Sequence, residues 1–279
     1  MLSWLWGAEE ARRVRLVEIG LAVLLGARIV LSPFRGLADQ PDALFRPVFF
    51  WAWSDGMPPV GAIVALQAIG AVAAGCVLTT RGPSRRIGFA LAWLCLLLLA
   101  GLRASQGKIM HNDLLLIFAC IPFLFAPADL ALDDRRPSPR WGWTLRVALV
   151  IISAAYFLAG WAKLTRSGPA WVFSDNMQWA LRGAGVSGKA PFPELSHWVA
   201  DQPWSALGTA AFIMGLELCF PVILFWPRSR PLFALGAIVL HALTWVLLGL
   251  DYWTWAAVVP LLLIDWPHTL ARRRDPIPA

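Results

Sequence analysis

The chain is dominated by apolar runs of the length that a membrane-crossing helix needs. Eight runs can be drawn along its 279 residues, at about 14–31, 58–79, 87–104, 112–131, 143–163, 205–226, 231–250 and 252–268. A helical crossing takes roughly 20 apolar residues, and backbone groups cannot stay unpaired in lipid. Charged residues make up only 15% of the chain, against about 25% in soluble domains. The sequence therefore predicts an all-α polytopic transmembrane helix bundle of about eight spans, forming one integral-membrane domain over residues 1–279.

Short arginine clusters between the runs indicate how the chain is oriented. Of its 24 lysines and arginines, fourteen fall on the side of the N-terminus and eight on the opposite side, while Arg28 and Arg146 fall within spans. Basic residues concentrate on the cytoplasmic side, so we expect both termini in the cytoplasm and the chain in a bacterial inner (plasma) membrane. The clusters form no continuous basic stripe, which argues against nucleic-acid binding. The expected partner is the lipid bilayer.

Two outer loops have the composition of segments that rest on a membrane surface. Residues 32–57 are rich in phenylalanine, tryptophan and proline, and residues 164–204 form the longest connection. In the second loop, apolar residues recur at helical spacing and predict interfacial helices, with Pro169 near one helix start. These residues are Phe173, Met177, Ala180 and Leu181, followed by Leu195, Trp198 and Val199.

Several polar residues fall in or near the outer half of the predicted bilayer. They come from different helices, as an active site or a proton path requires. The set consists of His111, Asn112 and Asp113 before the fourth span, Lys163 at the end of the fifth, Glu217 in the sixth, His241 and Thr244 in the seventh, and Asp251 after it.

Each of these residues also has an ordinary structural explanation. Lys163 can extend to the headgroups, Asn112 or Asp113 can cap a helix, and a lone histidine is often a packing residue. Glu217 is harder to dismiss, because a central carboxylate must be protonated or paired; Arg28 and Arg146 are its candidate partners.

The remaining chemistry-bearing residues give little sign of a metal centre. The four cysteines lie within apolar runs without metal-ligand spacing, and we predict no bound metal. Haem held by His111 and His241 is a weaker alternative, because transmembrane haem sites usually supply more histidines. The sequence shows no phosphate-binding loop motif and no recognisable Ser-His-Asp arrangement.

The segment Tyr156-Phe157-Leu158-Ala159-Gly160-Trp161-Ala162-Lys163-Leu164, followed by Pro169-Ala170-Trp171, resembles the vitamin K-dependent gamma-carboxylase and HTTM membrane family. His111-Asn112-Asp113, ahead of a span that ends Phe125-Ala126-Pro127, and His241, ahead of an aromatic-rich last span with Pro260, resemble two further family segments. The resemblance is strongest over residues 100–266. Ala162 stands where the carboxylase motif has a second lysine, and the order His111-Asn112 is reversed relative to the family.

The resemblance implies an enzyme in which Lys163 is the base that deprotonates a quinol, with His111 and His241 in supporting catalytic roles. The implied cofactor is a reduced quinone, vitamin K hydroquinone or a menaquinol-like molecule, with O2 and CO2 as co-substrates. The residues expected beside it are Asn112, Trp161, Trp171, Thr244 and Trp245. The chain ends soon after the last span, so we expect the membrane core without the lumenal C-terminal domain, and no carboxylation of protein glutamates.

Three functions follow as hypotheses. The first is a carboxylase-like membrane enzyme that acts on a lipid-soluble molecule, with a peptide or protein substrate on the outer side. The second is a non-enzymatic accessory or immunity-type membrane protein for maturation or export of a partner peptide. The third is a small transporter in which Glu217 and His241 carry protons.

Overall fold

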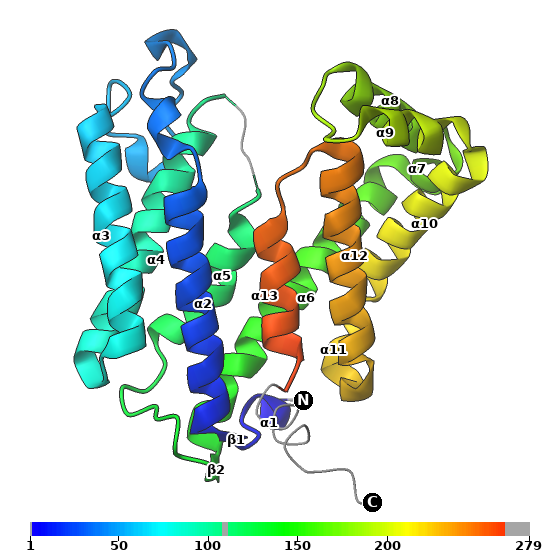
Figure 1. Cartoon of the computed structure of the whole chain (residues 1–279). Coiled ribbons are helices and arrows are strands. Elements are labelled where there is room, and N and C mark those ends of the chain that lie inside the picture. Colours follow the sequence, from blue (N-terminus) through cyan, green and yellow to red (C-terminus); the bar gives the residue numbers. More distant parts are fainter. Residues whose placement is uncertain (1, 108–110, 266–279) are drawn as a thin grey trace, which may run out of the picture. The chain divides into compact units, whose positions relative to one another are not determined.

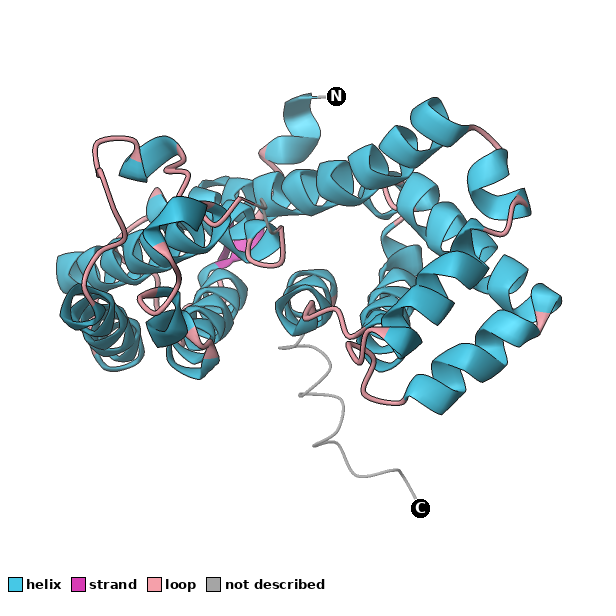
Figure 2. Ribbon diagram, turned by 90° about the horizontal axis from the view of Figure 1, so that it is seen from above, coloured by secondary structure: helices cyan, strands magenta, loops and turns pink. Residues whose placement is uncertain are grey.

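The computed structural model describes residues 2–107 and 111–265, and these residues are mostly helical (Figure 1). The α-helices are α1 (Leu2–Leu5), α2 (Ala11–Leu31), α3 (Val60–Thr79), α4 (Gly82–Ala104), α5 (Leu114–Leu124), α6 (Pro139–Ser167), α7 (Ala170–Phe173), α8 (Asn176–Val186), α9 (Pro193–Asp201), α10 (Pro203–Cys219), α11 (Val222–Phe225), α12 (Arg230–Leu248) and α13 (Trp253–Leu263). The 3-10 turns are η1 (Phe34–Leu37), η2 (Asp42–Leu44), η3 (Phe49–Trp51) and η4 (Pro227–Ser229). Figure 2 shows in magenta the two short antiparallel strands, β1 (Glu9–Glu10) and β2 (Pro137–Ser138). The all-α prediction is confirmed.

Among the described residues, four helices are long and apolar enough to cross a membrane: Val60–Thr79, Gly82–Ala104, Pro139–Ser167 and Pro227–Leu248. They match four of the eight predicted spans. The first predicted span corresponds to α2, which carries several charged residues. The other three correspond to α5, α10 and α13, which have 17 residues or fewer. Proline accounts for part of this shortening, because Pro221 separates α10 from α11 and a proline removes a helix hydrogen bond. The count of eight spans stays a prediction, and residues 266–268 of the last one lie outside the described residues.

The chain divides into two compact units, and helix α6 contributes to both. The first unit takes the residues up to Ala148 together with Asp265, and the second takes Leu149–Ile264. In the first unit, α2, α3 and α4 lie side by side (Figure 1), with α5 packed on α2 and α4. In the second, α12 packs on α13, and α8, α9 and α10 contact one another and α12. The single-domain expectation stays a prediction.

Buried ion pairs tie the helices of the first unit together. Glu18 on α2 is fully buried, accepts a hydrogen bond from Arg15 at 2.8 Å, and forms a second, close ion pair with Arg85 on α4. Arg85 also donates to the carbonyl of Pro127 at 2.7 Å. Arg15 and Arg85 belong to the arginine clusters from which the orientation is predicted, and both are buried in the structure.

The predicted surface loops contain short helical segments. Residues 32–57 hold η1, η2 and η3, and residues 164–204 hold α7, α8 and α9. Pro169 lies directly before α7, as expected. Of the residues predicted on one apolar face, Phe173 ends α7, while Met177, Ala180 and Leu181 lie on α8; Met177 and Leu181 are buried, and Phe173 and Ala180 are exposed.

Candidate functional site

An ion pair between Lys163 and Glu217 joins α6 to α10 in the second unit. The Lys163 Nζ donates to both carboxylate oxygens of Glu217, at 2.7 Å to Oε1 and 2.6 Å to Oε2. The Glu217 side chain is 9% exposed and that of Lys163 26% exposed. The pair is therefore largely removed from solvent on the carboxylate side and reachable on the ammonium side. The two arginines predicted as partners of Glu217 make other contacts: Arg28 pairs with Asp113, and Arg146 donates to the carbonyl of Gly7.

Gly160 makes this pairing possible. It lies one helical turn before Lys163 on α6, where a Cβ atom would stand 2.9 Å from the Glu217 Cβ and 3.1 Å from the backbone nitrogen of Leu218. Such contacts are too close for a side chain, so the absence of one lets α6 and α10 approach. In the Ala-Gly-x-x-Lys spacing, the close contact between α6 and α10 at Gly160 therefore lies one helical turn from the Lys163 ammonium.

An aromatic ring flanks the Lys163 ammonium. Its Nζ lies 5.3 Å from the centre of the Trp171 ring, which belongs to α7. A cation at this distance from an indole face is attracted by the ring quadrupole. Lys163 is thus held between a carboxylate and an indole. The structure brings Trp171, predicted beside the cofactor, next to the predicted base.

His241 lies in a second polar centre of the same unit, with an aromatic surround. Its Nε2 is 2.6 Å from the hydroxyl of Tyr156, and the two side chains are 7% and 1% exposed. Tyr156 stacks on Phe220, with ring centroids 4.1 Å apart, and Trp255 packs edge-on to both Tyr156 and His241. Tyr156 is thus the hydrogen-bond partner of His241, a role that sequence reasoning missed although the residue opens the quoted motif.

The other predicted residues of the second unit surround these centres less closely. Thr244 donates to the carbonyl of His241 at 3.0 Å. Trp161 and Trp245 are about half exposed, at 48% and 52%. Asp251 is exposed and follows the end of α12. That end is made by Gly249 in the left-handed conformation (φ +65°), against the carbonyl of Lys189, where a side chain would not fit.

His111, Asn112 and Asp113 belong to the first unit, not to the unit that holds Lys163 and His241. His111 is exposed, while Asn112 and Asp113 are buried. Asp113 precedes α5 without making a side-chain cap. Its carboxylate instead binds Arg28 of α2 and Arg103 of α4, the latter at 3.2 Å. Asp113 thus has a structural role in holding α2, α4 and α5 together.

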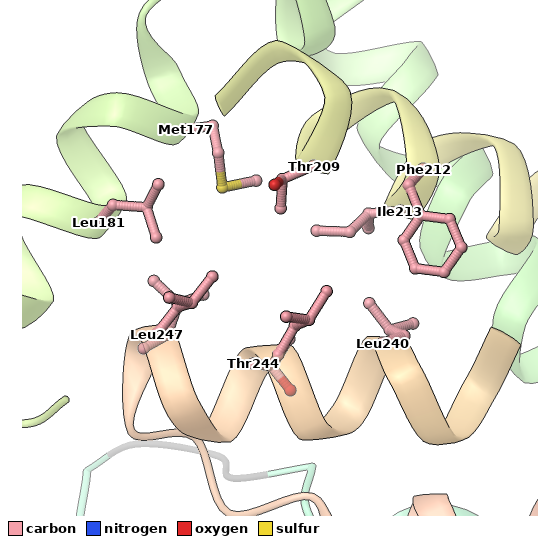
Figure 3. A pocket seen from close by; sticks show the side chains of 10 residues that line it. Met177, Leu181, Thr209, Phe212, Ile213, Leu240, Thr244 and Leu247 are labelled. Atoms are coloured by element: carbon pink, nitrogen blue, oxygen red, sulfur yellow. The ribbon is translucent and has the colours of Figure 1, made fainter. Parts of the chain in front are cut away.

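An apolar pocket lies between α8, α10 and α12. Figure 3 shows Met177 and Leu181 on one side and Leu240, Thr244 and Leu247 on the other. The remaining lining residues are Thr209, Phe212, Ile213, Leu243 and Leu248. The hydroxyls of Thr209 and Thr244 donate to backbone carbonyls of their own helices. The pocket is therefore apolar but small, with room for about one water-sized group.

The described residues contain no group of three or more His, Cys, Asp or Glu side chains placed to hold a metal ion. None of the four cysteines forms a disulfide; Cys95 and Cys120 are buried, Cys76 is half-buried and Cys219 is exposed. The prediction of no metal stays a prediction.

Comparisons with known proteins place no further constraint on the site, since no family model, curated protein or solved structure matches the chain. The class that the fold defines is an all-α protein with helices able to span a membrane. The resemblance to the gamma-carboxylase and HTTM family rests on the quoted residues alone.

Proposed function

We propose that this chain is an integral-membrane enzyme that removes a proton from a lipid-soluble, quinol-like molecule at the Lys163–Glu217 pair. The observation that carries the proposal is the contact of one ammonium with both oxygens of a mostly buried carboxylate. In a low-dielectric site, a charged pair is in competition with its neutral form. In the neutral form Glu217 holds the shared proton and Lys163 is an amine with a lone pair.

That amine is the proposed base. It takes the proton of a substrate hydroxyl, so an O–H bond breaks and an N–H bond forms, and the resulting ammonium lies beside the new oxyanion. Lys163 is the more exposed partner, which suits it for contact with substrate. The adjoining Trp171 and the Tyr156–His241 centre supply aromatic and hydrogen-bonding surroundings for a flat ring.

The residues around the pair fit such a molecule in part. The apolar pocket between α8, α10 and α12 is too small for an aliphatic tail, so such a tail would stay in the surrounding lipid. If the molecule is a reduced quinone, O2 and CO2 are the co-substrates that the family resemblance implies, with a peptide or protein on the outer side as a further substrate.

We further propose that α8 and α9 rest on the membrane surface. The Ser196 hydroxyl of α9 donates to the carbonyl of Leu247 at 2.8 Å, which places α9 at the end of the membrane-length helix α12. Trp179 on α8 and Trp198 on α9 are exposed, and tryptophan favours the headgroup level. With eight spans, both termini lie in the cytoplasm of a bacterial inner membrane, and α8 and α9 lie outside.

Mass spectrometry of small molecules that co-purify in mild detergent tests the proposal. We expect a quinone- or quinol-type lipid with the wild-type protein. A bound haem, or bulk phospholipid alone, would argue against the proposed substrate. Lys163→Ala separates enzyme from accessory protein, because an enzyme loses turnover while staying inserted, whereas an accessory protein keeps its cellular effect.

A second function, a small proton-coupled transporter, is favoured by one specific observation. Tyr156 on α6 hydrogen-bonds His241 on α12, and Lys163 on α6 pairs with Glu217 on α10, so α6 makes a polar contact with each of the other two helices. Titratable groups on neighbouring helices are typical of proton relays in membranes. Vesicles containing the protein should then show solute flux that depends on a pH gradient and is abolished by Glu217→Gln. Flux that persists in this variant, or no flux in the wild type, excludes the transporter.

A further inference from the structure

The hydrogen bond between Tyr156 and His241 has a direction that can be worked out by accounting for the protons. The Tyr156 hydroxyl carries a single hydrogen, and its hydrogen-bond partner among the described residues is the Nε2 of His241. The side chain is 1% exposed, so solvent offers no alternative acceptor. A buried hydroxyl that fails to donate costs about 1–3 kcal/mol. The hydroxyl therefore donates to Nε2, which must be the unprotonated nitrogen of the ring.

The other ring nitrogen then follows. A doubly protonated His241 is unfavourable here, because the ring is buried, its Nε2 would compete with the Tyr156 proton, and its Nδ1 has no carboxylate partner among the described residues. In the neutral ring, an unprotonated Nε2 requires the proton on Nδ1. This Nδ1 is buried and makes no hydrogen bond to the part of the chain that the structure describes. His241 therefore holds an N–H that still needs an acceptor.

We infer that Tyr156 is a positioning residue that fixes His241 in the Nδ1–H tautomer, so that His241 donates a hydrogen bond to an oxygen of the substrate. His241 is then a donor and not a second base. The inference rests on the proposed function for the identity of the substrate, but the tautomer itself does not depend on it. The two polar centres take opposite roles, with proton removal at Lys163–Glu217 and oxygen recognition at His241.

The tautomer can be measured directly. In protein labelled with ¹⁵N-histidine, protonated and unprotonated ring nitrogens have well separated chemical shifts, and His241 is assigned by the signals that His241→Gln removes. We expect an unprotonated Nε2 and a protonated Nδ1. Tyr156→Phe keeps the ring but removes the donor, so the Nδ1–H preference should be lost. Thr244→Val removes a hydroxyl that binds the His241 carbonyl, not its ring, and should leave the tautomer unchanged. A protonated Nε2 in the wild type, or an unchanged spectrum in Tyr156→Phe, overturns the inference.

Binding of a matched pair of probes tests the donor role. 1,4-Naphthoquinone has carbonyl oxygens, and naphthalene has a similar shape without them. One hydrogen bond from a buried donor should favour the quinone by about tenfold in Kd. His241→Phe should remove that preference, because it removes the N–H and keeps an aromatic ring. Equal preference in the wild type and His241→Phe contradicts oxygen recognition by His241, whatever the outcome for Lys163.

Discussion

The ammonium of Lys163 contacts both carboxylate oxygens of Glu217 across 54 residues of sequence, from α6 to α10. Separately, each charge would be costly in an apolar helix bundle. Together they form a pair whose proton can reside on either member. The basicity of Lys163 therefore depends on Glu217 as well as on its apolar surroundings.

A double-mutant cycle should detect this pairing as a coupling in stability. Lys163→Met and Glu217→Gln each leave one partner without its counter-charge, and each should lower the free energy of unfolding by about 1–3 kcal/mol. The double variant should lose less than the sum, with a coupling of about 1 kcal/mol or more. Thermal unfolding in detergent gives all four values. Simple additivity would mean that the pair contributes nothing to folding.

Gly160 should tolerate no side chain. In Gly160→Ala the new Cβ would stand 2.9 Å from that of Glu217, so α10 must move at a cost of about 1–3 kcal/mol. Gly215→Ala on α10 is the matched control, because open space surrounds that position and alanine favours helix. Thermal unfolding of both variants compares them. Equal stability of the two alanine variants would contradict the close approach at Gly160.

Arg85 and Arg86 should differ sharply despite being neighbours. Arg85 is fully buried against Glu18, whereas Arg86 is exposed. Arg85→Gln leaves the Glu18 carboxylate with one cation in place of two, and should lower stability by about 3–5 kcal/mol. Arg86→Gln should change it by less than about 0.5 kcal/mol. If expression of folded protein and its unfolding temperature are the same for both variants, the buried ion pair is not structural.

Spin labels should place α8 and α9 at the membrane surface. Single cysteines are introduced at Trp179 and Trp198 after the four native cysteines are replaced by alanine. Their accessibility to oxygen and to a water-soluble nickel complex is then compared with two references. Val72, exposed on the membrane-length helix α3, should report lipid, and Asp133, in the loop before α6, should report water. The two tryptophan positions should lie between these references; values equal to those at Asp133 would rule out an interfacial position.

The sequence predicts the helical class and the first member of the site, because both depend on local information. Run lengths give membrane-length helices, and the Ala-Gly-x-x-Lys spacing singles out Lys163. The partner could not be chosen in the same way. Glu217 is an unusual carboxylate in the sequence, but the candidate partners there are Arg28 and Arg146, and the pairing with Lys163 depends on the packing of α10 against α6 at Gly160.

Two other features depend on tertiary contacts that cannot be predicted from composition. The chain has seventeen tryptophans and only two tyrosines, and both tyrosines lie beside His241. That scarcity is the one signal that could have directed attention to Tyr156. Arg15 and Arg85 resemble cytoplasmic boundary residues in sequence, because nothing local shows that Glu18 draws them inward.

The most direct test of proton removal by Lys163 is the spectrum of a bound hydroquinone. A 1,4-naphthohydroquinone is added to the protein in detergent without oxygen, and its hydroxyl and phenolate forms are distinguished by ultraviolet absorption. We predict the phenolate on the wild-type protein, where the Lys163 ammonium lies beside the new oxyanion, and a bound but fully protonated molecule on Lys163→Met, which has neither the amine nor a cation to offset the oxyanion. A phenolate of equal intensity on Lys163→Met, or a wild-type protein that binds the hydroquinone without forming phenolate, would contradict the assignment of Lys163 as the base.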